Sequence, residues 1–381
     1  MIYLDNAATS WPKPESVYTA ADRAARECAG NPGRSGHGLS MAAGRILRET
    51  RMLTARFFNA PDAERLVFTL NATDALNLAI HGLLAPGGHV ITSSLEHNSV
   101  ARPLEALRRL GVRVTKLPAD PVNGLDPAQV CAAISADTRL VAVTHVANTT
   151  GTVNPIAEIG AICRERSVLL LVDAAQSAGT RPVDIQGMNI DLLAFPGHKG
   201  LLGPQGTGGL YIGINAAPRP MREGGTGSLS HMLEQPDVLP DRYESGTPNV
   251  PGLAGLAAGI RYISDLTPRA ILEHEAKLAN RLIDGLAGIP GIRLYGPPAC
   301  PGRSGVVSFT IHGVDTVEAS MIMDQGFGIA VRYGLHCAPD AHRTLGTLET
   351  GGTIRVSAGC MNTETDIELC LEAAANIASM H

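Results

Sequence analysis

The sequence predicts an α/β protein in which a mostly parallel β-sheet forms a large domain and a smaller α+β domain follows it. Between residues 66 and 212, short apolar segments alternate with helical segments, which indicates strands joined by crossover helices. The apolar run at 168–172 is uninterrupted, as is typical of a strand buried on both faces. After Gly246 the pattern changes to longer helical segments and further short strands, which indicates a second domain.

Each short apolar run in the first part of the chain predicts one strand. These strands cover residues 66–69, 89–93, 112–117, 139–146, 168–172, 191–195 and 209–212. Helices are expected between them at 73–84, 99–110, 127–134 and 156–166. The second domain should contain helices at 253–266, 268–287 and 364–380 and strands at 306–311, 329–332 and 353–356. Residues 224–249 are rich in Gly, Pro and Ser and predict a long functional loop near the boundary.

Composition limits the kind of protein. The chain has 381 residues, a net charge of -5 and no clustered basic stripe, so neither nucleic acid nor a membrane surface is an expected partner. The N-terminus lacks a signal-peptide pattern, and no apolar run approaches the roughly 18–20 residues of a membrane-spanning helix, so we expect a cytoplasmic protein. The seven cysteines are scattered and form no CxxC pair, which argues against a disulfide framework or a structural zinc site.

Two residues with complementary chemistry stand at the ends of predicted strands. Asp173 ends the run VLLLVD, and Lys199 follows the strand at 191–195 within PGHKG. Open α/β sheets bind ligands at the C-terminal ends of their strands. A lysine amine can form a Schiff base with an aldehyde, and a carboxylate can keep a pyridine nitrogen protonated so that the ring accepts electrons. The pair therefore indicates a site for pyridoxal 5'-phosphate (PLP).

Lysine is scarce in this chain, which narrows the choice of amine. Only Lys13, Lys116, Lys199 and Lys277 occur. Lys13 lies between two prolines near the terminus, and Lys277 lies on a charged helix face, so both fit poorly. Lys116 lies in a predicted strand and stays open as an alternative to Lys199 when the residues are considered alone.

A series of motifs resembles the class V aminotransferase family. In chain order they are YLDNAATS at 3–10, NATDALN at 71–77, EHNS at 96–99, VDAAQSAG at 172–179, FPGHKGLLGPQGTGGLY at 195–211, ESGTPNVPG at 244–252, RYGLHCAP at 332–339 and GGTIRVSAG at 351–359. The resemblance implies fold type I of the PLP-dependent transferases, with a central seven-stranded sheet. On this basis we assign residues 16–250 to the large PLP-binding domain, and residues 1–15 and 251–381 to the small domain that carries the catalytic cysteine.

The resemblance also implies a role for each matching residue around the ring. Lys199 would carry the Schiff base, and Asp173 would pair with the pyridine nitrogen. Gln176 would donate to the ring hydroxyl oxygen. His97 would stack on the ring face as a catalytic residue, and Asn148 would lie beside both the ring and the substrate.

The cofactor phosphate would lie at the N-terminus of the helix that begins near Thr73, where free N–H groups and the helix dipole favour an anion. Ala72 and Thr73 would bind it together with His198, and the dimer partner would lend Thr247. Pro196 departs from the family pattern, which often has Ser or Thr at this place. Because proline offers neither a hydroxyl nor an N–H group, we expect that anchoring contact to be missing.

The residue that favours a desulfurase over a transaminase is Cys337. Its segment RYGLHCAP resembles the active-site cysteine segment of cysteine desulfurases. Gly334 and Pro339 predict a loop that brings the thiol to the cofactor. His336 is adjacent in sequence and is a candidate for lowering the thiol pKa.

Two arginines complete the predicted substrate site. Arg355, eighteen residues after Cys337, resembles the family arginine that clamps the substrate α-carboxylate with two parallel N–H bonds. Arg332 is assigned to the substrate as well. The short spacing between Cys337 and Arg355 resembles the SufS-like (group II) desulfurases.

The implied activity converts L-cysteine to L-alanine and leaves a persulfide on Cys337. The resemblance further implies a homodimer, a sulfur-acceptor protein and a place in iron–sulfur cluster assembly. Three alternatives stay open: a selenocysteine lyase, another class V lyase or aminotransferase in which Cys337 is incidental, and a non-catalytic binding protein. A metal role for His336, Cys337 and His342 lacks a matching ligand spacing.

Overall fold

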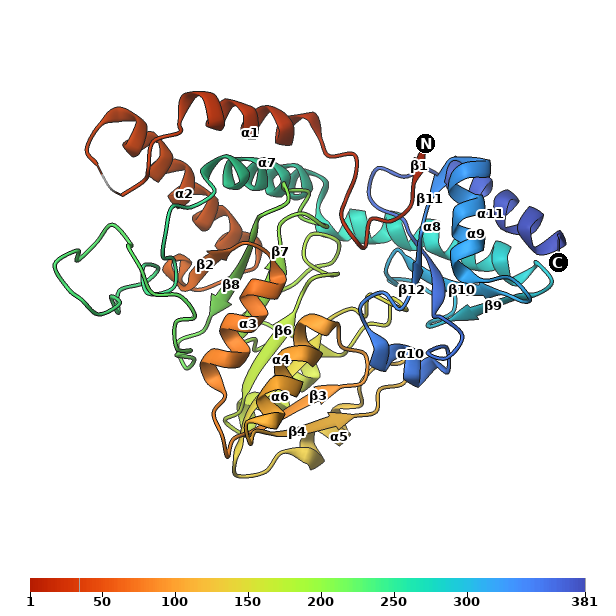
Figure 1. The fold of residues 1–381 in the computed structure, drawn as a ribbon, viewed down its shortest axis with the longest axis horizontal. Coiled ribbons are helices and arrows are strands. Elements are labelled where there is room, and N and C mark those ends of the chain that lie inside the picture. The colour runs from red at the N-terminus through yellow and green to blue at the C-terminus, as the bar shows by residue number, and fades with distance from the viewer. Residues whose placement is uncertain (34, 381) are drawn as a thin grey trace.

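A sheet with the strand order β2-β8-β7-β6-β5-β3-β4 forms the centre of the larger lobe in the computed structural model, which describes residues 1–33 and 35–380 (Figure 1). Its strands are β2 (Leu66–Thr69), β3 (His89–Ser93), β4 (Arg113–Leu117), β5 (Thr138–Thr144), β6 (Leu169–Asp173), β7 (Leu192–Pro196) and β8 (Gly208–Ile212). β8 runs antiparallel to β2 and β7, and the other neighbours in this sheet are parallel. The predicted mostly parallel seven-stranded sheet is therefore confirmed.

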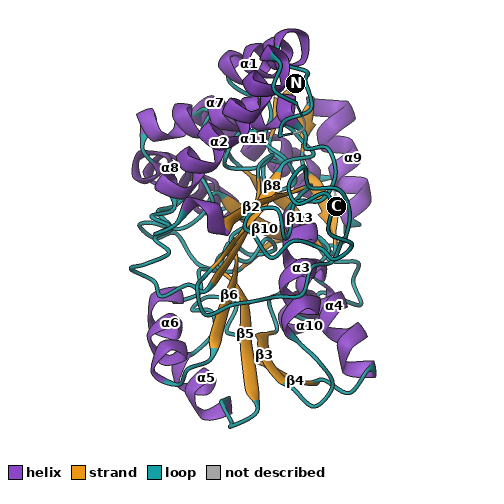
Figure 2. Ribbon diagram, turned by 90° about the vertical axis from the view of Figure 1, so that its left-hand side faces the viewer, coloured by secondary structure: helices purple, strands orange, loops and turns teal. Residues whose placement is uncertain are grey.

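Helices cover both faces of this sheet (Figure 2). α3 (Ala72–Leu83) and α4 (Asn98–Arg109) lie on one side, and α5 (Pro127–Ala133) and α6 (Ile156–Glu165) lie on the other. Because successive strand residues point to opposite faces, Leu140 packs in the core under α3 while Val141 packs in the core under α6. This two-sided burial explains why the strands read as continuous apolar runs.

Three further helices pack at one end of the larger lobe. They are α1 (Glu15–Glu27), α2 (Gly38–Phe57) and α7 (Val250–Leu266), and α1 lies along α7 (Figure 1). α1 and α2 were not predicted; α1 is polar on average and its buried residues are Val17 and Ala24. Each helix within residues 1–33 and 35–380 is too short or too polar to cross a membrane.

The smaller lobe is built on an antiparallel sheet with the order β12-β13-β10-β9. Its strands are β9 (Ile292–Tyr295), β10 (Val306–Ile311), β12 (Arg332–Gly334) and β13 (Thr353–Ser357), and its helices are α8 (Pro268–Ala287), α9 (Thr316–Phe327), α10 (Pro339–Leu345) and α11 (Glu364–Ser379). β9, α9 and α10 were not predicted. The strand predicted at 329–332 is divided into β11 (Ile329–Ala330) and β12, which belong to different sheets.

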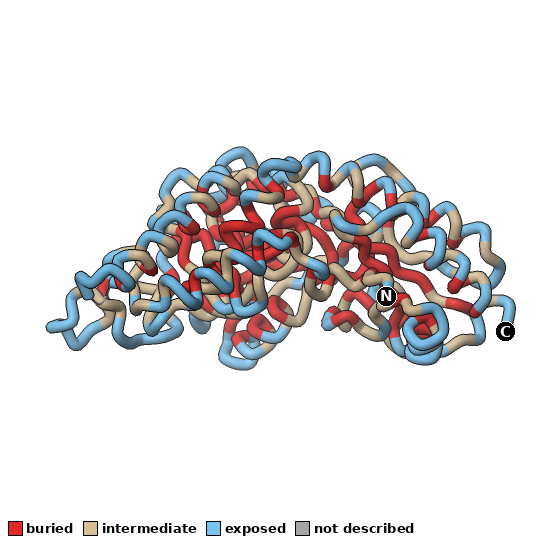
Figure 3. Tube along the Cα trace, turned by 90° about the horizontal axis from the view of Figure 1, so that it is seen from above, coloured by how far each residue is buried: buried red, intermediate tan, exposed pale blue. Residues whose placement is uncertain are grey.

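The N-terminal residues pack with this smaller lobe. β1 (Ile2–Tyr3) pairs in parallel with β11, and Leu4 is buried in the same core as α8 and α11. Buried residues run through the interior of both lobes, with exposed residues outside them (Figure 3). The exact domain boundaries at residues 15 and 250 stay a prediction.

A long segment without helix or strand connects β8 to α7, which confirms the loop predicted at 224–249. A buried ion pair holds its C-terminal part. Nη1 and Nη2 of Arg51 donate to the two carboxylate oxygens of Glu244 at 2.6 and 2.8 Å, and the N–H of Phe68 donates to the same carboxylate at 2.6 Å. Because Glu244 stands three residues before Thr247, this pair fixes where the segment returns to α7.

Replacing Arg51 with alanine should lower the free energy of unfolding by about 3–5 kcal/mol, because it leaves the Glu244 carboxylate buried without its cation. Urea unfolding of the variant would measure the change. The matched control is Arg23→Ala, which removes an exposed, solvent-screened ion pair with Glu27 and should lower the free energy of unfolding far less. Equal effects of the two substitutions would contradict a structural role for the buried pair.

Candidate active site

The C-terminal ends of β5, β6 and β7 border a cavity of about 280 Å³, into which Thr144, Asp173 and Pro196 bring the last residue of each strand. This is the place where open α/β sheets bind ligands. Most of the predicted site residues line it together: Ala72, Thr73, His97, Asn148, Asp173, Gln176, His198, Lys199, Arg332 and Arg355. Residues far apart in sequence therefore meet in one place.

Lys199 and Asp173 form the charged centre of the cavity. Asp173 is 2% exposed, and its Oδ1 accepts the N–H of Ala175 at 2.9 Å. Burial raises the pKa of Asp173, and the N–H of Ala175 and the charge of Lys199 oppose this change. Burial lowers the pKa of Lys199 to about 8, with Asp173 opposing and Arg355 and Arg332 adding to the shift. A larger fraction of this amine is thus neutral and nucleophilic near neutral pH than for a solvated lysine.

His97 caps the N-terminus of α4 and is held in one orientation. Its Nδ1 accepts the N–H of Ser99 at 3.1 Å and lies 2.9 Å from the Ser99 hydroxyl. The same hydroxyl lies 2.7 Å from Oγ1 of Thr73, so Ser99 joins α4 to α3. Burial, assisted by the charge of Lys199, lowers the pKa of His97 to about 4. The imidazole is therefore neutral at physiological pH and suited to packing against a flat ring. Ser99 was missed as a site residue, although it belongs to the motif EHNS.

The N-terminus of α3 supplies the groups expected for a phosphate. The N–H groups of Ala72 and Thr73 precede the first intrahelical bonds, so they point out of the helix end. His198 lies beside them in the cavity wall, with its Nδ1 3.1 Å from Oγ1 of Thr9. Burial lowers the pKa of His198 to about 4, so this ring is also neutral. Pro196 lies in the same wall and offers no donor there.

Arg355 and Asn148 carry buried polar atoms that lack a partner among the described residues. Arg355, in β13, is 1% exposed; its Nη1 donates to the backbone oxygen of Asn148 at 3.0 Å, and its Nη2 donates to Oδ1 of Asp5 at 2.8 Å. Nδ2 of Asn148 donates to the backbone oxygen of His336 at 2.7 Å. Nε of Arg355 and Oδ1 of Asn148 remain unpaired. Buried polar groups normally have partners, so these atoms are suited to a bound molecule.

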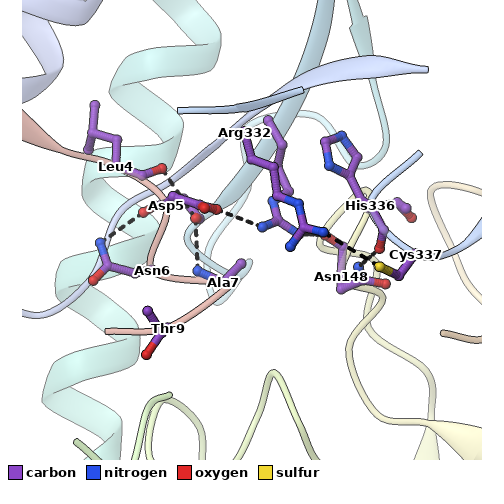
Figure 4. Close-up of polar contacts among 12 residues, drawn as sticks. Leu4, Asp5, Asn6, Ala7, Thr9, Asn148, Arg332, His336 and Cys337 are labelled. Carbon is purple, nitrogen blue, oxygen red and sulfur yellow. Dashed lines mark hydrogen bonds and ion pairs between the residues drawn. The ribbon is translucent and has the colours of Figure 1, made fainter. Parts of the chain in front are cut away.

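Cys337 is exposed, in the loop between β12 and α10. Its Sγ lies 3.5 Å from Nη2 of Arg332, which lines the cavity, so the thiol lies beside the cavity wall (Figure 4). The backbone oxygen of Cys337 accepts the N–H of Asn98 at 2.7 Å. His336 and Cys337 adopt left-handed backbone angles, with φ of 48° and 57°, which cost energy in non-glycine residues. These backbone contacts hold the loop in a conformation that presents the thiol.

The prediction that His336 lowers the thiol pKa is wrong. The ring of His336 is buried inside the smaller lobe, with Nε2 3.0 Å from Oγ1 of Thr353 and its centroid 5.4 Å from that of His342. Burial lowers the pKa of His336 itself to about 2, so the ring carries no positive charge. The cation beside the thiol is Arg332 instead.

At the edge of the site, Thr247 and Gln176 make contacts that differ from the roles implied by the family motifs. Thr247 is exposed and lies outside the cavity of Lys199. Its hydroxyl accepts from Nδ2 of Asn31 at 3.4 Å. A contribution from a second subunit therefore stays a prediction. Nε2 of Gln176 donates to the backbone oxygen of Ala7 at 2.9 Å, which brings the N-terminal segment into the site. The motif YLDNAATS was noted in the sequence, but no role was assigned to its residues.

With this geometry established, the chain can be placed among known proteins. A family model described as Aminotransferase class-V matches residues 2–370. The chain therefore belongs to the class V aminotransferase family. The enzymes of this family that the chain resembles depend on PLP.

Within that family, several proteins similar to this chain are named cysteine desulfurases. A probable cysteine desulfurase of Methanothermobacter thermautotrophicus is 39% identical, over 100% of this chain and 95% of that protein. The apo structure of the cysteine desulfurase of Thermococcus onnurineus NA1 has a TM-score of 0.91 and 34% identity, covering 100% of this chain and 95% of that one. The cysteine desulfurase CsdA of Escherichia coli, solved as an S-sulfonic acid, has a TM-score of 0.88 and 30% identity, covering 99% of this chain and 94% of that one.

Proposed function

We propose that this chain binds PLP in the cavity around Lys199 and acts as a cysteine desulfurase on L-cysteine. The observation that carries the proposal is one cavity lined by the half-buried Lys199, the buried Asp173 and the buried Arg355, with an exposed thiol beside its wall. The names of the relatives and neighbours point to the same activity. Homodimer formation, a sulfur-acceptor protein, a role in iron–sulfur cluster assembly and a cytoplasmic location belong to this proposal through the family resemblance.

The residues in the wall fit this cofactor. The Lys199 amine suits a Schiff base, and the buried Asp173 carboxylate, which has a single hydrogen bond, suits a protonated ring nitrogen. Gln176 would bind the ring hydroxyl, and the neutral His97 ring would cover one face. The phosphate would be held by Ala72, Thr73, His198 and, from a second subunit, Thr247. When bound, PLP supplies an electron sink that acidifies the Cα proton of an amino acid and weakens its Cβ–S bond.

The protein's own groups then divide the work on the substrate. Nε of Arg355, which has no partner among the described residues, would offer an N–H group to the α-carboxylate. Oδ1 of Asn148, also unpaired, accepts a hydrogen bond beside it. The Lys199 amine would accept the Cα proton as a general base, and its lowered pKa suits this task.

Cys337 supplies the nucleophile for sulfur transfer. Its thiolate attacks the substrate sulfur, an S–S bond forms, and the Cβ–S bond breaks with its electron pair remaining on carbon. The carbon takes up a proton, L-alanine leaves, and Cys337 carries a persulfide for the acceptor. Nη2 of Arg332, 3.5 Å from Sγ, lies beside the attacking sulfur and contacts it. The exposure of Cys337 leaves the persulfide open to a partner.

The activity should appear as L-alanine formed from L-cysteine without any keto acid. Chromatography of the reaction mixture would measure alanine against consumed cysteine, with an expected ratio of one to one. A requirement for a keto acid would identify an aminotransferase and contradict the proposal. Turnover of L-selenocysteine with none of L-cysteine would identify a selenocysteine lyase.

A further inference from the structure

The N-terminal segment, residues 3–10, is fixed between the two lobes at the active site. At one end Leu4 is buried in the core of the smaller lobe, and the backbone of Asp5 forms a bridge with Ser357. At the other end the N–H of Ser10 donates to the backbone oxygen of His198 at 3.1 Å, next to Lys199. The hydroxyl of Tyr3 donates to the backbone oxygen of Thr9 at 2.9 Å and holds the turn between the two ends. The segment at residues 3–10 is therefore a fixed structural part of the active site.

Its carboxylate, Asp5, is paired with Arg355. Oδ1 of Asp5 accepts from Nη2 of Arg355 at 2.8 Å, and the arginine side chain is 1% exposed. Arg332 lies directly opposite Arg355 on the neighbouring strand and lines the same cavity. Like charges at opposed strand positions repel each other. Two guanidinium groups thus share one wall, and Asp5 is the carboxylate paired with Arg355 among the described residues.

The N–H donors of the Arg355 guanidinium have different partners, of which the Asp5 carboxylate is one. Nη2 is occupied by Asp5, Nη1 by the backbone oxygen of Asn148, and Nε is unpaired although buried. A substrate carboxylate that binds Nε must therefore share the guanidinium with Asp5. The two carboxylates would then lie on the same planar group, close enough to repel each other.

We propose that Asp5 is a resident counter-ion of Arg355 that limits how tightly the cavity binds amino-acid carboxylates. It holds the guanidinium oriented in the empty site, and its negative charge opposes the incoming one. This inference rests on the proposed function, in which Arg355 binds the α-carboxylate. Asp5 is thereby a positioning residue that sets the affinity for substrate and product.

Replacing Asp5 with the isosteric asparagine should change the affinity for a carboxylate ligand in a defined direction. In Asp5→Asn, the amide oxygen can still accept from Nη2 of Arg355, but the negative charge is gone. A carboxylate ligand should therefore bind more tightly, on the order of tenfold, because one of two unit charges held by the same guanidinium has been removed. A ligand without a carboxylate should be unaffected.

The test is calorimetric titration of the purified protein with 3-mercaptopropionate, which is cysteine without its amino group, and with the corresponding neutral amide. Asp5→Asn should tighten binding of the acid by about tenfold and change binding of the amide by less than about twofold. Tyr3→Phe is the matched control, because it loosens the same segment and leaves the Asp5 carboxylate in place. Its affinity ratio of acid to amide should equal that of the wild type. Thermal unfolding checks that both variants are folded.

Acid binding that is unchanged or weaker in Asp5→Asn would overturn the inference, as would equal tightening of acid and amide or no acid binding to either form. The same shift in Tyr3→Phe would assign the effect to the segment and not to the charge, and would also overturn it. Neither ligand can form a Schiff base, so the titration is independent of turnover. Failure of the proposed function would give a different result. The protein would form no alanine from L-cysteine, but Asp5→Asn would still tighten the binding of 3-mercaptopropionate.

Discussion

Replacing Cys337 with serine is expected to abolish sulfur loading of the protein while leaving the cofactor bound. Serine keeps the size of the side chain but lacks a nucleophile that can take up sulfur, so alanine formation should fall on the order of 10³-fold or more. The cavity residues around Lys199 are untouched, and Cys337 does not line that cavity. Intact-mass measurement after incubation with L-cysteine should show one added sulfur in the wild type and none in the variant.

The chain contains a closely matched control for this experiment. Sγ of Cys131 lies 3.5 Å from Nη2 of Arg166, the same separation as between Cys337 and Arg332, but it lies outside the cavity of Lys199. Cys131→Ser should therefore keep full activity and full sulfur loading. If Cys337→Ser still produced alanine at the wild-type rate, or Cys131→Ser lost activity to the same degree, the nucleophile would have been assigned wrongly.

The strands of the larger lobe could be predicted because strands that are buried on both faces consist largely of apolar residues. Leu140 and Val141 face opposite cores and are both fully buried, so the strand they share contains a continuous apolar run at 140–143. α1 gave no such signal, since its packing against α7 needs only a narrow apolar face. The order of the antiparallel strands in the smaller lobe is likewise set by tertiary contacts and not by local pattern.

The same distinction separates the parts of the site that were predicted from those that were not. Asp173 ends β6 and Lys199 follows β7, and the ends of parallel strands meet at one edge of a sheet, so both residues line one cavity while their roles stay a prediction. The ion pair of Asp5 with Arg355 joins residues 350 positions apart, and no local pattern indicates which carboxylate an arginine will find. The role given to His336 was wrong because adjacency in sequence does not set side-chain direction: a turn of left-handed backbone sends His336 inward and leaves Cys337 exposed.

Replacing Lys199 with alanine should remove the absorbance of a lysine-bound cofactor and reduce alanine formation on the order of 10³-fold or more, because both the Schiff-base amine and the general base are lost. Absorption spectroscopy after addition of PLP would measure the first effect. Lys116→Ala is the control, since Lys116 lies outside this cavity and pairs with Asp340. Retention of the lysine-linked spectrum in Lys199→Ala with loss in Lys116→Ala would move the Schiff base to Lys116.

The pH dependence of PLP capture by the cofactor-free protein tests the environment of the same amine. Burial lowers the pKa of Lys199 from 10.5 to about 8, and only the deprotonated amine attacks an aldehyde. The capture rate should therefore rise with pH up to about 8 and level off above it, whereas an exposed lysine would give a rise that continues beyond pH 10. Stopped-flow absorbance would follow the rate. A profile that continues to climb would show that the reacting amine is solvated, and would remove the basis for treating Lys199 as a base poised for proton transfer near neutral pH.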